Sequence, residues 1–387
     1  MTLAIITPLN SGIREIVLES LKMKFVIYNK LTVAIFCNFQ IHNKKDMLID
    51  LRSDTVTKPT KEMHAAMMNA EVGDDVFGED PSVKKLEEKC ASLLGMEAAV
   101  FCPSGTMTNQ IGIKVLTQPY DEVICYKGSH IYKYEGGGMA GNCLVSARLI
   151  EGDRGRLSVK DVEESINNYN DPHQPRTSVV ALENTVVREG GSYYTLDQIK
   201  EVSEFSRSKG LKMHMDGARI FNALTETKEE AKAYGKYFDT ISVCLSKGLG
   251  APVGSVLVCK KEFEHQVRRI RKVFGGGMRQ AGYLAAAGVY ALDHHIKRLG
   301  EDHKRAREME SILKKLGWIE KVKPVDSNIV IFVIDNKFTP EQVLQRLSEY
   351  NIKALKFGPQ EIRMVTHLDF TDDMLEQTNK IFKELSF

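Results

Sequence analysis

From Met47 onward, short apolar segments of strand length alternate with longer segments of helical pattern. Several apolar segments have no polar face, which is typical of strands buried on both sides of a sheet. Strands that alternate with helices favour a mostly parallel sheet covered by helices. The sequence therefore predicts an α/β fold. Its expected strands are Ala98–Cys102, Glu122–Tyr126, Ser178–Asn184, Leu211–Asp216, Thr240–Leu245 and Gly254–Cys259.

Two helices have clear end signals. The first follows Asp80-Pro81, carries an apolar stripe and ends at Gly95. The second begins with the capping-box pair Thr195 and Gln198 and ends before Gly210.

The character of the chain changes after the helical region near residues 281–316. The remaining elements predict a compact α+β unit: Asn328–Ile334, a helix beginning near Thr339, Ile352–Phe357, Ile362–Thr366 and a last helix from Thr371. A chain of 387 residues suits one large domain and a smaller one. We expect a large domain over residues 47–295 and a small C-terminal domain over residues 296–387.

The first 46 residues are treated separately. Their apolar patches are interrupted by polar residues and fall short of the roughly 18–20 apolar residues of a membrane-spanning helix. They lack the basic start and continuous apolar run of a secretory signal, and with one Arg they make a poor transit peptide. We expect a loosely ordered extension, or a start codon placed too early.

Charge and cysteine usage exclude several classes of protein. The formal net charge is +2, so no strong field attracts nucleic acid or an anionic membrane. The seven cysteines form no CxxC pair and no metal-ligand spacing, and most lie in apolar runs. This usage indicates a reducing compartment, so we expect a cytoplasmic protein with no metal site.

Lys247 is the first residue that indicates chemistry. It follows the strand Thr240–Leu245 directly and lies in the Gly-rich stretch Ser246–Gly254. A Lys there is poorly placed as a solvated charge but well placed as an amine held near a carbonyl cofactor, where desolvation favours the reactive neutral form. A purely structural Lys is the alternative.

Asp216 ends another apolar strand, Leu211–Asp216. A carboxylate buried there is costly unless it meets a positive partner. A protonated pyridine nitrogen is such a partner and would make pyridoxal 5′-phosphate (PLP) an electron sink. An ion pair with Arg219 is the alternative.

A turn after the strand Ala98–Cys102 opens a helix with Ser104, Gly105 and Thr106. Backbone N–H groups at a helix start, with Gly and hydroxyl side chains, can form a phosphate cradle. Lys272 and Arg279, which flank a run of three glycines, could add phosphate contacts. Many such turns bind nothing, and a Gly run can be a flexible turn.

Two further residues are candidates. His130, just beyond the strand Glu122–Tyr126, could stack on a pyridine ring and exchange protons with a substrate oxygen. Its alternative is a packing or surface role. Arg363, on the strand Ile362–Thr366, could bind a substrate carboxylate with its two-pronged guanidinium. Its alternative is a surface ion pair.

Taken in this order, these elements resemble the threonine aldolase family. The resemblance begins at Asp50 and continues to the C-terminus. Four of its segments are highly specific together: Gly73–Asp80, Met215–Arg219, Ser246–Gly250 and Gly275–Gln280.

The resemblance implies a PLP-dependent transferase-like large domain with a seven-stranded type of sheet, and a homotetramer or homodimer with sites at subunit interfaces. It implies that Lys247 carries the cofactor as an imine, that Asp216 pairs with the pyridine nitrogen and that His130 stacks on the ring. Gly105 and Thr106 would hold the phosphate. The substrate carboxylate would be held by Ser53, Arg219 and Arg363, with Lys272 and Arg279 near the site.

The implied reaction is the cleavage of L-threonine or L-allo-threonine to glycine and acetaldehyde. One departure affects it: the family usually has a His after Glu-Asn-Thr, and this chain has Val186. His130, or a water that it positions, is then the remaining candidate to take the hydroxyl proton. Another PLP reaction (β-elimination or racemisation) and a non-catalytic scaffold stay open. A nicotinamide enzyme is disfavoured because no GxGxxG follows an early strand.

Overall fold

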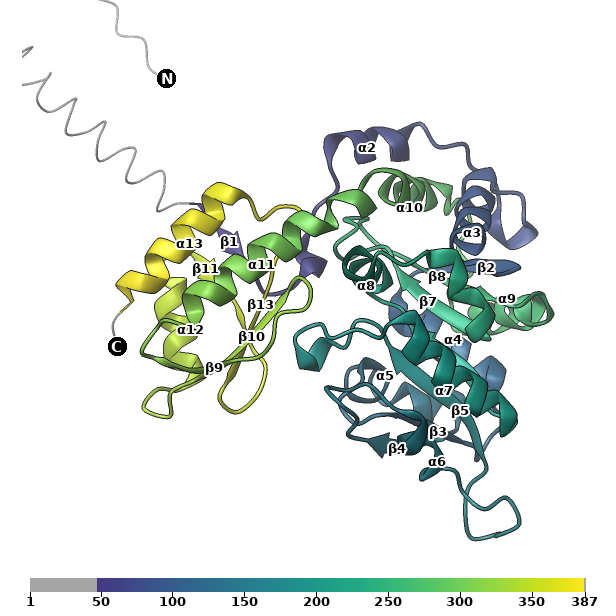
Figure 1. Ribbon diagram of the computed structural model, residues 1–387. Helices are drawn as coiled ribbons and strands as arrows, with labels where there is room; N and C mark the ends of the chain where they lie inside the picture. The colour runs from purple at the N-terminus through teal and green to yellow at the C-terminus, as the bar shows by residue number, and fades with distance from the viewer. Residues whose placement is uncertain (1–46, 386–387) are drawn as a thin grey trace, which may run out of the picture.

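The computed structural model describes residues 47–385, so the expected N-terminal extension lies outside the described residues. Figure 1 shows a large layered body and a smaller unit that contains the C-terminal elements. No helix between residues 47 and 385 has the length and apolar character needed to cross a bilayer. The cysteines of this range are free and buried, while Cys37 lies outside it.

The large body is built on one sheet. Within the described chain it has seven strands in the order β2-β8-β7-β6-β5-β3-β4. β8 runs antiparallel to both its neighbours, and the other pairs are parallel. This confirms the predicted fold class. The strands are β2 (Ala98–Cys102), β3 (Glu122–Tyr126), β4 (Ser146–Ile150), β5 (Thr177–Glu183), β6 (Lys212–Asp216), β7 (Thr240–Cys244) and β8 (Ser255–Cys259).

The predicted strands agree with the observed ones to within one residue at each end. β4 is the strand that the sequence does not predict. It pairs with β3 at the edge of the sheet, and its residues are mostly exposed or half-buried. The segment therefore lacks the apolar run that identifies the other strands.

Helices cover both faces of the sheet because successive strand residues point to opposite sides. In β3, Ile124 packs into one core and Val123 into the other. The first core contains residues of α3 (Pro81–Leu94), α7 (Leu196–Ser208), α8 (Ile220–Thr227) and α10 (Gly282–His294). The second contains residues of α4 (Gly105–Leu116) and α9 (Glu264–Val273), and α2 (Lys61–Met68) packs on α10.

The predicted helix ends are confirmed. Asp80 caps α3 by accepting a hydrogen bond from the Val83 N–H at 3.0 Å, and Gly95 closes it at φ 66°. Thr195 and Gln198 form the capping box of α7.

The smaller unit has an antiparallel sheet in the order β12-β13-β10-β9. Thr339 and Thr371 cap helices, as predicted. The predicted strand Ile352–Phe357 is divided into two short strands. The elements are β9 (Ile319–Val322), β10 (Ile329–Ile334), β11 (Ile352–Lys353), β12 (Leu355–Lys356), β13 (Glu361–Val365), α11 (Leu299–Leu313), α12 (Pro340–Ser348) and α13 (Asp372–Glu384).

The first described residues lie in this smaller unit. β1 (Ile49–Asp50) pairs in parallel with β11, and Ile49 and Leu51 pack into the core of the unit. The structure thus groups residues 49–51 with the C-terminal elements, whereas the sequence grouped them with the large domain. A two-residue strand carries no pattern that the sequence could show. The boundary between the large and the small domain near residue 295 remains a prediction.

Candidate active site

Two pockets meet where the carboxyl ends of the parallel strands face the smaller unit. The first, about 280 Å³, is lined by Gly105, Thr106, His130, Asp216 and Lys247, among others. The second, about 340 Å³, shares His130 and Lys247 and extends to Ser53, Arg219 and Arg363. The structure therefore brings together all the predicted site residues except Lys272 and Arg279.

The start of α4 forms one wall of the first pocket. Ser104 caps the helix by accepting a hydrogen bond from the Met107 N–H at 3.2 Å. The N–H groups of a first helical turn have no partner within the helix, so Gly105 and Thr106 can donate to an anion. Gly105 is required here, because a Cβ would lie 2.5 Å from the Cys244 Sγ.

Asp216, at the end of β6, is 2% exposed. It accepts hydrogen bonds from the Asn109 Nδ2 at 3.0 Å and from the Ala218 N–H at 3.1 Å. It forms no ion pair with Arg219, so the alternative raised by the sequence is wrong.

Arg219 is paired with Asp54. Its Nε and one terminal nitrogen donate to the two carboxylate oxygens of Asp54 at 2.8 and 2.6 Å. Both side chains are buried. Burial alone would raise the pKa of Asp54, but Arg219, Lys247 and a hydrogen bond from Asn328 hold that pKa well below its ordinary value. Arg219 thus lines the second pocket from a fixed position.

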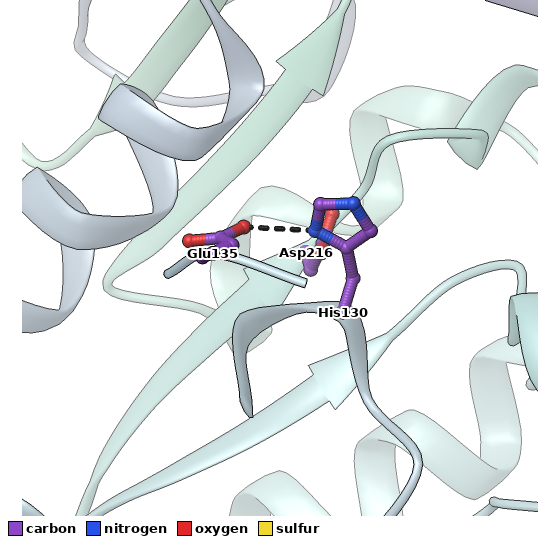
Figure 2. A group of neighbouring side chains, drawn as sticks. All are labelled: His130, Glu135 and Asp216. Atoms are coloured by element: carbon purple, nitrogen blue, oxygen red, sulfur yellow. Dashed lines mark hydrogen bonds and ion pairs between the residues drawn. The ribbon is translucent and has the colours of Figure 1, made fainter. Parts of the chain in front are cut away.

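His130, Glu135 and Asp216 converge at the first pocket, which His130 and Asp216 line (Figure 2). The His130 Nδ1 lies 3.0 Å from the Glu135 Oε1. Burial would lower the pKa of His130, but the hydrogen bond to Glu135 and the charge of Asp216 raise it above its ordinary value. Burial raises the pKa of Glu135. Since a carboxylate accepts, Glu135 favours the tautomer with hydrogen on Nδ1.

These three residues could offer ligand atoms within 4.8 Å of one another. However, the Asn109 Nδ2 lies 2.8 Å from the Glu135 Oε1 and 3.0 Å from the Asp216 Oδ2. The facing oxygens already accept hydrogen bonds, so we assign the cluster as a hydrogen-bonded network rather than a metal site.

Glu183, the last residue of β5, connects two loops of the site. Its carboxylate accepts the backbone N–H of His130 and the backbone N–H of Val187, each at 2.9 Å. Burial and the charge of Asp216 raise its pKa to about 7. This buried side chain fixes the segment that carries His130 relative to the segment after β5.

Val186 takes the position where the family usually has a His. Its side chain is 0% exposed and packs in the apolar core, while the neighbouring Val187 lines the second pocket. The position therefore offers the site no titratable group.

Arg363 extends from β13 to the second pocket. It donates to the Arg52 carbonyl at 3.0 Å, and its guanidinium lies 4.6 Å from the Phe357 ring centroid. Burial and Arg219 lower its pKa to about 10. Its Nε is buried without a hydrogen-bond partner, and Arg363 forms no ion pair with any carboxylate of residues 47–385. The surface ion pair is therefore wrong, and the guanidinium is available to an anion.

Lys272 and Arg279 lie elsewhere. Lys272 lines a separate surface depression beside α9, and Arg279 pairs with Asp74 at 2.9 Å. Neither lines the two pockets. Phe77 lines the same depression and is 73% exposed.

Reasoning from the sequence missed several residues of the site. A signal existed for His214, a polar residue inside an apolar strand. The others meet only through the tertiary fold. The missed residues are Asp54, Asn109, Glu135, Glu183, His214, Tyr134 and Phe357.

Comparisons with known proteins identify the family of the chain. The family model described as beta-eliminating lyase matches residues 50–337. The probable low-specificity L-threonine aldolase 2 of Arabidopsis thaliana is 40% identical over 87% of this chain and 97% of its own. The low specificity L-threonine aldolase of Escherichia coli is 40% identical over 85% of this chain and 97% of its own.

The fold is similar to that of the solved threonine aldolase of Leishmania major. The TM-score is 0.74 at 21% identity, over 87% of this chain and 99% of that one. With the family match and the extent of identity, this likeness leads to one conclusion. The chain belongs to the threonine aldolase family, a group of lyases that depend on pyridoxal phosphate.

Proposed function

We propose that this enzyme cleaves L-threonine and L-allo-threonine to glycine and acetaldehyde. The observation that carries the proposal is the position of Lys247, which lines both pockets. On one side of Lys247 lie the buried carboxylate of Asp216 and the N-terminal end of α4. On the other lies Arg363, which has no acidic partner among the described residues. The names of the relatives support the same reaction.

The residues of the first pocket fit PLP. Lys247 offers the amine that attaches the cofactor, and Asp216 offers a buried carboxylate for the protonated ring nitrogen. The N–H groups of Gly105 and Thr106 suit the phosphate. When bound, the protonated ring supplies an electron sink for the bond that breaks at Cα.

The second pocket suits the substrate carboxylate. Arg363 would bind it with a guanidinium that pairs with no carboxylate of residues 47–385, and Ser53 would add its hydroxyl. Arg219 would contribute positive charge from its fixed position on Asp54. Fixing the carboxylate orients the Cα–Cβ bond relative to the cofactor.

His130 would take the proton of the substrate 3-hydroxyl, directly or through a water. Because Glu135 holds its Nδ1, neutral His130 presents the Nε2 lone pair. The hydroxyl proton leaves, the Cα–Cβ bond breaks to release acetaldehyde, and a proton added at Cα completes glycine. The atoms of threonine are all found in the two products.

A rival reaction remains because Val186 is buried in the core and offers no second base. β-Elimination or racemisation would use the same residues around the cofactor. Elimination releases pyruvate from serine, and the proposed reaction releases acetaldehyde from threonine. Racemisation releases neither product and instead inverts the substrate at Cα, so assays of both products and of the substrate configuration distinguish the three reactions.

We also propose a cytoplasmic homotetramer or homodimer. Lys272 and Arg279 lie apart from the pockets of their own chain and beside Phe77, an exposed aromatic side chain. Aromatic side chains and Arg are enriched at subunit interfaces. Light scattering of the purified enzyme tests the assembly, and a single-chain mass would refute it.

The decisive experiment compares wild type with Lys247→Ala. We expect wild type to show the visible absorbance of lysine-bound PLP and to release acetaldehyde from L-threonine, and the variant to do neither. The absorbance without acetaldehyde would redirect the proposal to another PLP reaction. No absorbance in wild type would refute the cofactor site.

A further inference from the structure

A buried chain of hydrogen bonds reaches the first pocket at Asn109 and Asp216, which both line it. The Thr240 Oγ1 lies 2.9 Å from the His214 Nδ1, and the His214 Nε2 lies 3.2 Å from the Asn109 Oδ1. The Asn109 Nδ2 then donates to the Glu135 Oε1 at 2.8 Å and to the Asp216 Oδ2 at 3.0 Å. All five side chains are at most 5% exposed. Asn109 is therefore the junction between β6, α4 and the segment that holds His130.

The partners fix the direction of every hydrogen bond in this chain. The amide nitrogen of Asn109 must face the two carboxylates, so its oxygen faces His214. His214 then carries its hydrogen on Nε2, and its Nδ1 accepts from the Thr240 hydroxyl. Burial lowers the pKa of His214 to about 4, so the ring is neutral near pH 7.

The helix is shaped to admit the His214 ring. A Cβ at Gly112 of α4 would lie 2.7 Å from the His214 Cε1. Only Gly at this position lets the ring lie against the helix and reach Asn109. The hydrogen bond between His214 and Asn109 therefore depends on the absence of a side chain at Gly112. This close packing against the helix backbone also fixes the orientation of the His214 ring.

Without Asn109, two neighbouring carboxylates would lose a shared donor. Asp216 would keep one hydrogen bond, which the Ala218 N–H donates. Glu135 would keep one hydrogen bond, with the His130 ring. The Asp216 carboxylate would then be held less firmly in the orientation that the pyridine nitrogen needs.

We propose that Asn109, held by His214, is a positioning residue that fixes the Asp216 carboxylate toward the cofactor ring and the Glu135 carboxylate toward His130. The inference rests on the role of Asp216 in the function proposed above. The Asn109 amide donates to both carboxylates. In this way it holds Asp216 toward the cofactor and Glu135 toward His130.

The test uses three variants and a matched control in the full-length enzyme. Asn109→Ala removes the junction, His214→Phe removes its support with little change in volume, and His214→Gln keeps an N–H donor. The control is Thr117→Val, which removes a buried hydrogen bond to the Ile113 carbonyl at the other end of α4. The readouts are the PLP dissociation constant and the nitrogen NMR shift of ¹⁵N-labelled PLP, which reports protonation of the ring.

We expect Asn109→Ala to raise the dissociation constant about tenfold to a hundredfold, the range for a lost hydrogen bond to a charged group. The ring nitrogen should lose protonation in this variant. His214→Phe should act in the same direction but less, while His214→Gln and Thr117→Val stay near wild type.

Two results would overturn the inference. One is a folded Asn109→Ala enzyme with wild-type affinity and ring protonation. The other is an equal effect of Thr117→Val, which would indicate general loosening of α4. Different results would show that the proposed role of Asp216 is itself wrong. In that case bound PLP in the wild-type enzyme would have an unprotonated ring nitrogen, or Asp216→Asn would leave the protonation of the ring nitrogen unchanged.

Discussion

The ion pair between Asp54 and Arg219 leads to the most direct prediction about stability. Asp54 is 0% exposed and Arg219 5%, and two hydrogen bonds join them. Asp54→Asn keeps the shape but turns an amide toward the guanidinium, so a buried charge loses its partner. Breaking a buried pair in this way costs about 3–5 kcal/mol of the free energy of unfolding.

The assay is urea unfolding followed by circular dichroism, with Asp50→Asn as the control. Asp50 also pairs with an arginine, Arg52, but that guanidinium is 46% exposed. An exposed pair contributes roughly 0–1 kcal/mol, so the control should unfold close to wild type. Equal unfolding free energies for Asp54→Asn and Asp50→Asn would refute the reasoning.

The pH dependence gives a second check on the same pair. The pKa of Asp54 is lower in the folded state than in the unfolded chain, where it is near 3.9. Its contribution is therefore complete above about pH 5 and is lost as the pH falls toward the folded pKa. The difference between wild type and Asp54→Asn should narrow in acid, and a difference that widens there would contradict the assignment.

Three further predictions concern the site. Glu135→Gln removes the carboxylate that raises the pKa of His130, so the acid limb of the pH profile of kcat/KM should move to lower pH. An acid limb at the same pH as in wild type would argue against His130 as the base. Arg363→Lys loses the two-pronged contact, so KM for threonine should rise about tenfold to a hundredfold in steady-state assays, while the absorbance of bound PLP stays unchanged. Val186→His places a polar ring in the apolar core and should lower the free energy of unfolding by about 2–5 kcal/mol, as measured in urea. A variant with wild-type stability and higher activity would instead show that a side chain at position 186 can reach the active site.

The layered fold and the cofactor end of the site follow from the amino-acid pattern. Apolar runs without a polar face identify buried strands, because a strand covered on both sides must be apolar on both sides. Parallel strands end at one edge of the sheet, so residues that follow β3, β6 and β7 meet there. The positions of His130, Asp216 and Lys247 in the sequence are therefore enough to group them, and all three line the first pocket.

The substrate end is less visible in the sequence. Ser53 and Arg363 are far apart in the chain, and Ser53 is indicated by the family resemblance alone. They share a pocket because the first described residues pair with β11 and bring both parts of the chain into the smaller unit.

The pairing of buried polar groups depends on the three-dimensional packing. The sequence offers Arg219 as the partner of Asp216, but Arg219 pairs with Asp54, and Asp216 receives the Asn109 amide. Periodicity shows which face of a strand or helix is apolar. It does not show which buried polar atoms meet across the fold, because that depends on how helices and loops from distant parts of the chain pack against the sheet.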